Sequence, residues 1–144
     1  MPALEELYLG NNGVLSLPTN IGNLTGLRTL DVKLGGISRI PTRIGNLTEL
    51  RFLNIYGNAL TGVPAEIGNL AHLQTLRLFN NDIASLPAEF GNLTGLQILR
   101  LGGNNLTSLP TEFGNLTGLI FLNLSTNLLT SLPTTFGNLV NLQT

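Results

Sequence analysis

Leu96-Gln97-Ile98-Leu99-Arg100-Leu101-Gly102-Gly103-Asn104-Asn105-Leu106 is the stretch that decides the fold of this 144-residue chain. Written as a pattern, it is L-x-x-L-x-L-x-x-N-x-L. The same frame begins again, 23 residues apart each time, at Leu4, Leu27, Leu50, Leu73 and Leu119. A fixed period of this length predicts a solenoid, in which each repeat forms one coil and neighbouring coils bury a continuous core.

The remainder of each unit is equally regular. Prolines recur every 23 residues, and Ile or Phe followed by Gly-Asn-Leu comes three positions later; these prolines are Pro18, Pro41, Pro64, Pro87, Pro110 and Pro133. Proline lacks an N–H and is therefore suited to the start of a short helical turn. Glu66, Glu89 and Glu112 would lie in the first turn, where negative charge is favourable. We expect the glycine that follows to end the turn.

The leucines of the frame indicate short strands. Leu99 and Leu101 alternate, so they share one face of a strand, and successive coils would pair their strands in parallel about 4.8 Å apart. We predict an α/β fold, a right-handed curved solenoid with a parallel sheet on the concave face and short helical or 3₁₀ turns on the convex face. The strands should lie within Leu4–Leu9, Leu27–Val32, Leu50–Ile55, Leu73–Leu78, Leu96–Leu101 and Leu119–Leu124, and Leu142 could begin a seventh.

The asparagine of the frame is interpreted as structural. An inward-facing amide can bond backbone groups of its own turn and of the next one, which would otherwise be buried without partners. Gly35 replaces this asparagine in the second unit, so we expect the ladder to be broken there. The predicted ladder consists of Asn12, Asn58, Asn81, Asn104 and Asn127.

Over essentially its whole length the chain resembles the leucine-rich repeat family. The 23-residue unit with Leu-Pro-x-x-Ile/Phe-Gly-Asn-Leu is similar to the intracellular type, which includes plant Ras-group-related proteins and related protist and bacterial chains. It lacks the Gly-x-Ile-Pro of plant extracellular repeats. The resemblance implies recognition of a protein partner and no enzymatic activity.

Composition excludes several other functions. The net charge is −1 and charged residues make up only 10%, against about 25% in ordinary globular chains, so no field of one sign attracts nucleic acid or an anionic membrane. The chain has no cysteine, and its one histidine, His72, cannot anchor a zinc site alone, so we expect no metal and no cofactor. Residues 113–144 carry no charge, but Pro133 and the spaced apolar residues argue against membrane insertion.

Residues between the framework leucines should point outward on the concave face. Aromatic and arginine residues cluster there on the middle strands, a combination typical of interface hot spots. We therefore predict that the partner is bound by Phe52, Tyr56, Arg77, Phe79 and Arg100, with Tyr8, Asp31 and Lys33 as specificity contacts.

Residues 1–144 are interpreted as a single solenoid of six repeats and the start of a seventh, without obvious capping units. An uncapped coil exposes its core, so we expect a homo-oligomer formed through the C-terminal end. The residues assigned to that contact are Ile98, Ile120, Phe121 and Leu142. The chain opens with the acidic sequence Met1–Glu6 and no signal peptide, which favours the cytoplasm.

Three functions stay open. A scaffold that binds a protein through its concave face is favoured. Ice binding is the first alternative, because threonines form one column at positions 25, 48, 94 and 117, interrupted by Ala71 and Val140, and another at 61, 107 and 130, interrupted by Ala84. The second alternative is a piece of the ligand-recognition domain of a larger receptor, or of an enzyme.

Overall fold

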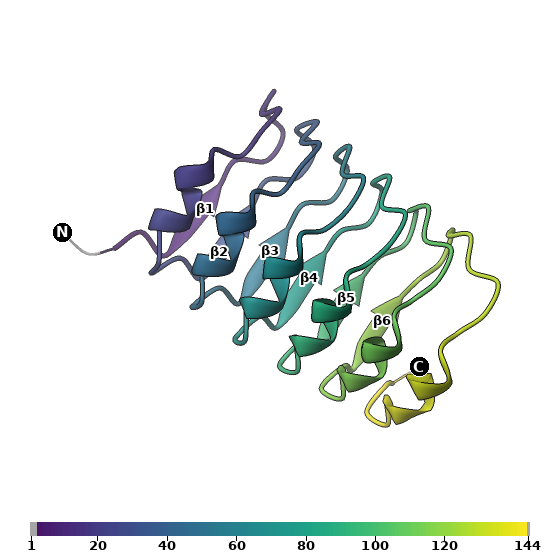
Figure 1. Ribbon diagram of the computed structural model, residues 1–144. Helices are drawn as coiled ribbons and strands as arrows, with labels where there is room; N and C mark the ends of the chain where they lie inside the picture. The colour runs from purple at the N-terminus through teal and green to yellow at the C-terminus, as the bar shows by residue number, and fades with distance from the viewer. Residues whose placement is uncertain (1–2, 144) are drawn as a thin grey trace.

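The computed structural model describes residues 3–143, which form six strands in one parallel sheet. Strand order follows chain order, and each strand residue pairs with the residue 23 positions later. The strands are β1 (Glu6–Tyr8), β2 (Thr29–Asp31), β3 (Phe52–Asn54), β4 (Thr75–Arg77), β5 (Ile98–Arg100) and β6 (Phe121–Asn123). The predicted solenoid and its parallel sheet are therefore confirmed (Figure 1).

Each strand is followed by a five-residue 3₁₀ helix on the opposite face of the coil (Figure 1). Every one of these helices begins directly after a repeat proline, as predicted. Glu66, Glu89 and Glu112 lie in the first turns of their helices. The helices are η1 (Thr19–Asn23), η2 (Thr42–Asn46), η3 (Ala65–Asn69), η4 (Ala88–Asn92), η5 (Thr111–Asn115) and η6 (Thr134–Asn138).

The core runs the length of the solenoid between the sheet and the helices. The framework leucines of the middle coils are completely buried, as Leu53, Leu76 and Leu99 illustrate. Phe90, at the helix position that holds isoleucine in earlier coils, stacks on Phe113, with ring centroids 6.3 Å apart. Each coil thus buries its apolar residues against equivalent residues of the next, which is why one coil could not be stable alone.

The glycines in the helices have a different role from the one predicted. Gly22 and Gly45 lie inside their helices, which end one residue later, so the glycine does not terminate the turn. A Cβ atom at Gly22 would lie 2.5 Å from the carbonyl oxygen of Arg43 in the next coil, and one at Gly45 would lie 2.7 Å from that of Glu66. Glycine is therefore needed because the backbone carbonyl of the next coil occupies the space that a side chain would fill.

The asparagine ladder is present, but it points backwards along the chain. Asn104 Nδ2 donates to Leu101 O of its own coil and to Leu78 O of the preceding coil, at 2.9 and 3.0 Å. Its Oδ1 accepts the N–H of Ile83, also in the preceding coil, at 3.0 Å. The prediction that the amide reaches the next coil was wrong. Asn12 belongs to the first coil, and its amide bonds only its own turn.

The interruption at Gly35 removes the amide that would bond the first coil, but it leaves the bonds from Asn58 to the second coil in place. Asn58 Oδ1 accepts the N–H groups of Gly35, Gly36 and Ile37 at 2.8–3.1 Å, whereas Oδ1 of Asn104 accepts one. Its Nδ2 donates to Val32 O in the same preceding coil at 3.1 Å. A side chain is missing at position 35, but the backbone of the second coil still receives bonds from the third.

The residue before each framework asparagine adopts a left-handed backbone, which the sequence pattern did not reveal. This position has φ between 54° and 65° in all six coils, whether it holds asparagine, glycine, leucine or threonine. Leu34 and Thr126 are unfavourable in this conformation, because their side chains crowd the backbone at positive φ. The coil geometry therefore overrides local preference.

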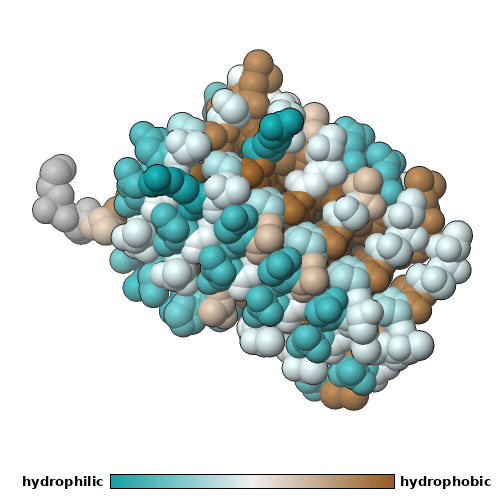
Figure 2. Space-filling model, viewed as in Figure 1, coloured by the Kyte–Doolittle hydropathy of each residue, from teal (hydrophilic) through white to brown (hydrophobic). Residues whose placement is uncertain are grey.

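The two ends of the solenoid differ from its middle. The predicted seventh strand after Leu142 falls outside the described residues, which end at position 143; Gln143 N donates to Ile120 O at 2.9 Å, as Ile120 N does to Gln97 O one coil earlier. At the other end, an apolar hollow of about 420 Å³ opens beside Leu9, Val14 and Leu17. Figure 2, seen from the same side as Figure 1, shows hydrophobic atoms in a diagonal band between the 3₁₀ helices and the tips of the loops.

Candidate protein-binding surface

The constant register of the sheet brings the predicted binding residues together. Arg77 of β4 and Arg100 of β5 are direct neighbours across the strands. In the adjacent column, Phe52 pairs with Thr75 and Ile98 pairs with Phe121. Residues separated by multiples of 23 in the sequence therefore form straight columns on the concave face.

Just beyond the strands, Tyr56 and Phe79 form a stacked aromatic pair. Their ring centroids are 4.4 Å apart, the rings are within 6° of parallel, and both side chains are half-buried. Such a pair contributes about 0.5–1.5 kcal/mol beyond the area it buries. It also holds two large, rigid side chains at the surface, so that a partner could be bound with little loss of side-chain entropy.

Each arginine of the cluster lies against an aromatic ring. The guanidinium carbon of Arg77 is 5.2 Å from the ring centre of Phe52, and that of Arg100 is 4.8 Å from the ring centre of Phe121. These cation–π contacts orient both side chains. Among residues 3–143, neither arginine makes an ion pair, and the buried Nε of Arg77 has no hydrogen-bond partner.

The three predicted specificity residues, Tyr8, Asp31 and Lys33, differ in how far they are exposed to solvent. Asp31 is only 6% exposed, because it accepts a hydrogen bond from Asn54 Nδ2 at 3.1 Å and lies 3.4 Å from Lys33 Nζ. Asp31 thus belongs to the strand β2 of the predicted surface, but its neighbours cover most of it. Lys33 is half-buried and paired with Asp31, so it offers a partner little free charge.

Tyr8 lies at the N-terminal edge of the sheet and is 62% exposed. Its hydroxyl donates a hydrogen bond to Glu6 Oε2 at 3.1 Å. This bond raises the pKa of Tyr8 above its ordinary value, and desolvation and the negative charges of Glu6 and Asp31 act in the same direction. Tyr8 is thus a neutral, accessible aromatic group, separated from the central cluster by β2.

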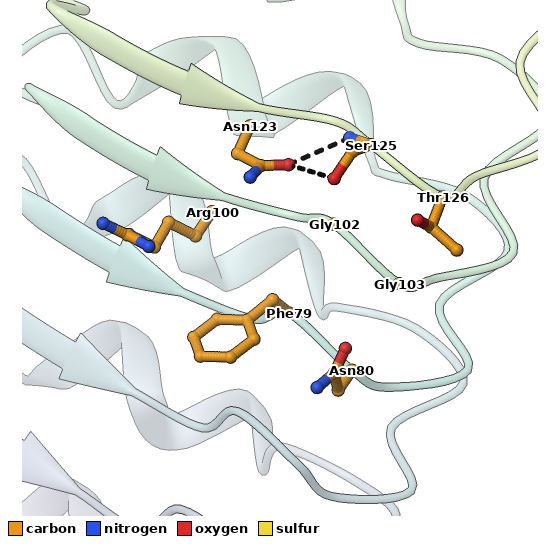
Figure 3. Close-up of a pocket in the computed structure, with 8 residues that line it drawn as sticks. All are labelled: Phe79, Asn80, Arg100, Gly102, Gly103, Asn123, Ser125 and Thr126. Carbon is orange, nitrogen blue, oxygen red and sulfur yellow. Dashed lines mark hydrogen bonds between the residues drawn. The ribbon is translucent and has the colours of Figure 1, made fainter.

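A hollow of about 190 Å³ adjoins the cluster and was missed by reasoning from the sequence (Figure 3). Gly102 and Gly103 form its floor, where neighbouring coils carry Phe79-Asn80 and Ser125-Thr126. The signal was present in the column that reads Tyr56, Phe79, Gly102 and Ser125, since a glycine between larger residues leaves space. The stem of Arg100 borders the hollow, and its guanidinium extends away along the strand.

One wall of the hollow is polar and partly pre-organised. Asn123 Oδ1 accepts hydrogen bonds from the backbone N–H and the hydroxyl of Ser125, at 2.9 and 2.7 Å (Figure 3). Those bonds orient the amide and leave its Nδ2 group without a partner among the described residues. The opposite wall is the ring of Phe79. The hollow could therefore receive a small side chain with both apolar and hydrogen-bonding parts.

The residues predicted for self-association lie on the last two strands and in the final coil. Ile98 of β5 is half-buried and pairs with Phe121 of β6, whereas Ile120 and Phe121 are 38% and 39% exposed at the C-terminal edge of the sheet. Leu142 is half-buried against the core. Phe121 also carries the guanidinium of Arg100, so it belongs to the concave cluster as well.

Few other side chains among residues 3–143 could take part in catalysis or metal binding. His72 is exposed, and its Nδ1 lies 2.9 Å from the carbonyl oxygen of Thr48. Within residues 3–143, no three metal-ligating side chains come together. The helices of the same part of the chain are all too short to cross a membrane.

Comparisons with known proteins agree with this architecture. A sequence model described as a leucine-rich repeat region matches residues 3–82, 38–119 and 64–144. No curated protein sequence matches the chain.

Solved structures that resemble the chain in both fold and sequence include three with 33–36% identity. The first is the ectodomain of the Arabidopsis thaliana receptor kinase GASSHO1/SCHENGEN3 in complex with Casparian strip integrity factor 2, with 36% identity and a TM-score of 0.88. A leucine-rich repeat protein of Leptospira interrogans has 35% identity and a TM-score of 0.70, and a TDR receptor has 33% and 0.85. Each match covers 96–97% of this chain but only 17%, 42% and 25%, respectively, of the other.

Proposed function

Since the chain belongs to the leucine-rich repeat family, we propose that it is a non-enzymatic scaffold, and that it binds a protein partner through the concave face of its sheet. One observation carries this proposal: the register places two arginines and four aromatic side chains on adjacent coils of a single face. Arginine and aromatic residues are enriched in the hot spots of protein interfaces. The receptor ectodomain of GASSHO1/SCHENGEN3, which is similar in fold, is itself in complex with an integrity factor.

The double variant Arg77→Ala, Phe79→Ala tests the surface. We expect it to weaken the affinity of the chain for a partner recovered by pull-down by about thirtyfold or more, the effect of losing one hot spot of about 2 kcal/mol. The measurement is a titration by surface plasmon resonance. The control is Arg39→Ala, Arg43→Ala, which removes two exposed arginines outside the sheet. If the double variant Arg77→Ala, Phe79→Ala and the native chain bound the partner with equal affinity, the proposal that the concave face is the binding surface would be refuted.

Ice binding is the alternative that rests on the threonine columns. The threonines at positions 25, 48, 94 and 117 are exposed, as are those at 61, 107 and 130. Both columns are interrupted by alanine or valine, which breaks the regular array of hydroxyl groups. We therefore expect no thermal hysteresis at millimolar concentration in a nanolitre osmometer. A hysteresis of tenths of a degree, abolished by valine at Thr94 and Thr117, would instead make this column the functional site.

A further alternative is that these coils belong to the ligand-recognition domain of a larger receptor. Two of the similar structures are receptors, and the chain spans about a fifth of their length. The repeat pattern, in contrast, favours the intracellular type and hence the cytoplasm. Sequencing the transcript separates these ideas, because a receptor requires a reading frame that continues into a membrane-spanning segment.

We also propose that residues 1–144 act as one solenoid that self-associates through its C-terminal coil. Val140 and Leu132 are 79% and 50% exposed, residues 113–144 carry no charged side chain, and no described strand covers the outer edge of β6. Unpaired edges and exposed apolar groups promote association. Light scattering over a concentration series should give a mass that rises above 15.4 kDa. A mass that stays at this value would contradict the proposal, and Val140→Lys should lower the association.

A further inference from the structure

The acidic side chains of β1 and β2 have hydrogen-bond or ion-pair partners, whereas the arginines of β4 and β5 have no acidic partner among residues 3–143. In β1 and β2, Glu6 accepts a bond from Tyr8, and Asp31 is paired with Lys33. In β4 and β5, Arg77 and Arg100 have no acidic partner within residues 3–143. The chain as a whole has a net charge of −1, yet the middle of its concave face presents unneutralised positive charge.

The two arginines also oppose each other. They are direct cross-strand neighbours, an arrangement that is unfavourable for like charges. Their guanidiniums lie apart, one over Phe52 of β3 and the other over Phe121 of β6. Thr75 and Ile98, which are half-buried, lie between these rings in the same column and form a floor with a cation at either side.

Two further features near the arginines call for hydrogen-bond acceptors. The Nε of Arg77 is buried and has no partner among the described residues, whereas buried polar groups are normally bonded. The hollow bordered by the stem of Arg100 also presents the Nδ2 group of Asn123, a donor. An acidic group is the ligand that would satisfy donors and charge together.

Building on the proposed function, we propose that the partner segment is acidic and that Arg77 and Arg100 bind its side-chain carboxylates. Phe52 and Phe121 belong to strands three spacings apart, or about 14 Å. An extended peptide rises about 3.4 Å per residue, so two acidic residues roughly four positions apart would match the two guanidiniums. A segment running across the strands would place its intervening residues over Thr75 and Ile98.

The experiment is a selection of random 12-residue peptides, displayed with their C-termini fused to a coat protein so that side chains offer the carboxylates. The native chain should enrich peptides with two Asp or Glu residues about four positions apart. For a selected peptide, the double variant Arg77→Gln, Arg100→Gln should raise the dissociation constant about a hundredfold, roughly tenfold for each arginine. The control Arg39→Gln, Arg43→Gln changes net charge equally and should leave it within about twofold. Equal thermal melting curves show that the variants are folded.

Several results would overturn the inference. Acidic peptides that bind equally well to both double variants would place the acid site elsewhere. Neutral peptides that lose affinity on Tyr56→Ala, Phe79→Ala would refute the acidic partner but leave the concave scaffold intact. A twelve-residue oligothymidylate that binds more tightly than the selected peptides would indicate a nucleic acid partner instead. If no peptide is enriched, the inference fails, and the pull-down titration with the Arg77→Ala, Phe79→Ala variant still tests the scaffold.

Discussion

Replacement of Asn81 by alanine is expected to lower the free energy of unfolding by about 3–5 kcal/mol. Asn81 is 7% exposed; its Nδ2 donates to Ile55 O and Leu78 O at 3.0 Å, and its Oδ1 accepts the N–H of Leu60 at 3.1 Å. Alanine would leave the N–H of Leu60 buried without a partner, at about 1–3 kcal/mol. It would also remove one of two side-chain bonds to each carbonyl, at about 0.5–1.5 kcal/mol per bond, since Asn58 also donates to Ile55 O and Asn104 to Leu78 O. Urea denaturation followed by circular dichroism measures the loss.

The matched control is Asn12→Ala, the same substitution at the same repeat position. Asn12 is exposed, and its amide bonds only Leu9 O and Gly10 O of its own turn. Since water can replace these bonds, we expect a loss below about 1 kcal/mol. Equal losses at both positions would mean that the amide acts within each coil, and that the bonds between coils contribute little stability.

Replacement of Gly68 by alanine is the second large effect, with an expected loss of about 1–3 kcal/mol. Alanine normally stabilises a helix by up to about 1 kcal/mol relative to glycine, so a loss reverses the usual sign. The reason is that the new methyl group would collide with the carbonyl oxygen and carbonyl carbon of Glu89 in the next coil. Backbone atoms cannot move aside as a flexible side chain can, so the two coils would have to separate. Thermal unfolding should show a lower midpoint.

Gly137 provides the control, because it occupies the same helix position in the last described coil. No atom of another described coil lies within 4 Å of a Cβ built there. Gly137→Ala should therefore leave the stability unchanged or raise it slightly, through lower entropy of the unfolded chain. If Gly68→Ala were also neutral, the glycine would be serving only the helix itself, and close packing between coils would not explain its place in the repeat.

Some site features could be predicted from the sequence and others could not. The columns of Arg77 with Arg100 and of Tyr56 with Phe79 followed from the period alone, because a constant register places equivalent residues side by side. The burial of Asp31 could not be predicted in this way, since it depends on Asn54 and Lys33 turning towards it. The hollow over Gly102 was readable as a gap in a column, but its size depends on the rotamers of its neighbours.

The sequence by itself determined the coil: its length, the parallel strands, the prolines that begin the helices, and which leucines form the core. It could do so because every coil has the same geometry, so the same residue types recur at equivalent positions in six coils. Only the tertiary structure decided how coils contact one another: that the amide of Asn104 bonds the preceding coil, that Gly68 admits the backbone of Glu89, and that position 126 has a left-handed backbone. These features depend on distances between residues 21 to 26 positions apart, and those distances are set when the coils stack and bury their apolar faces together.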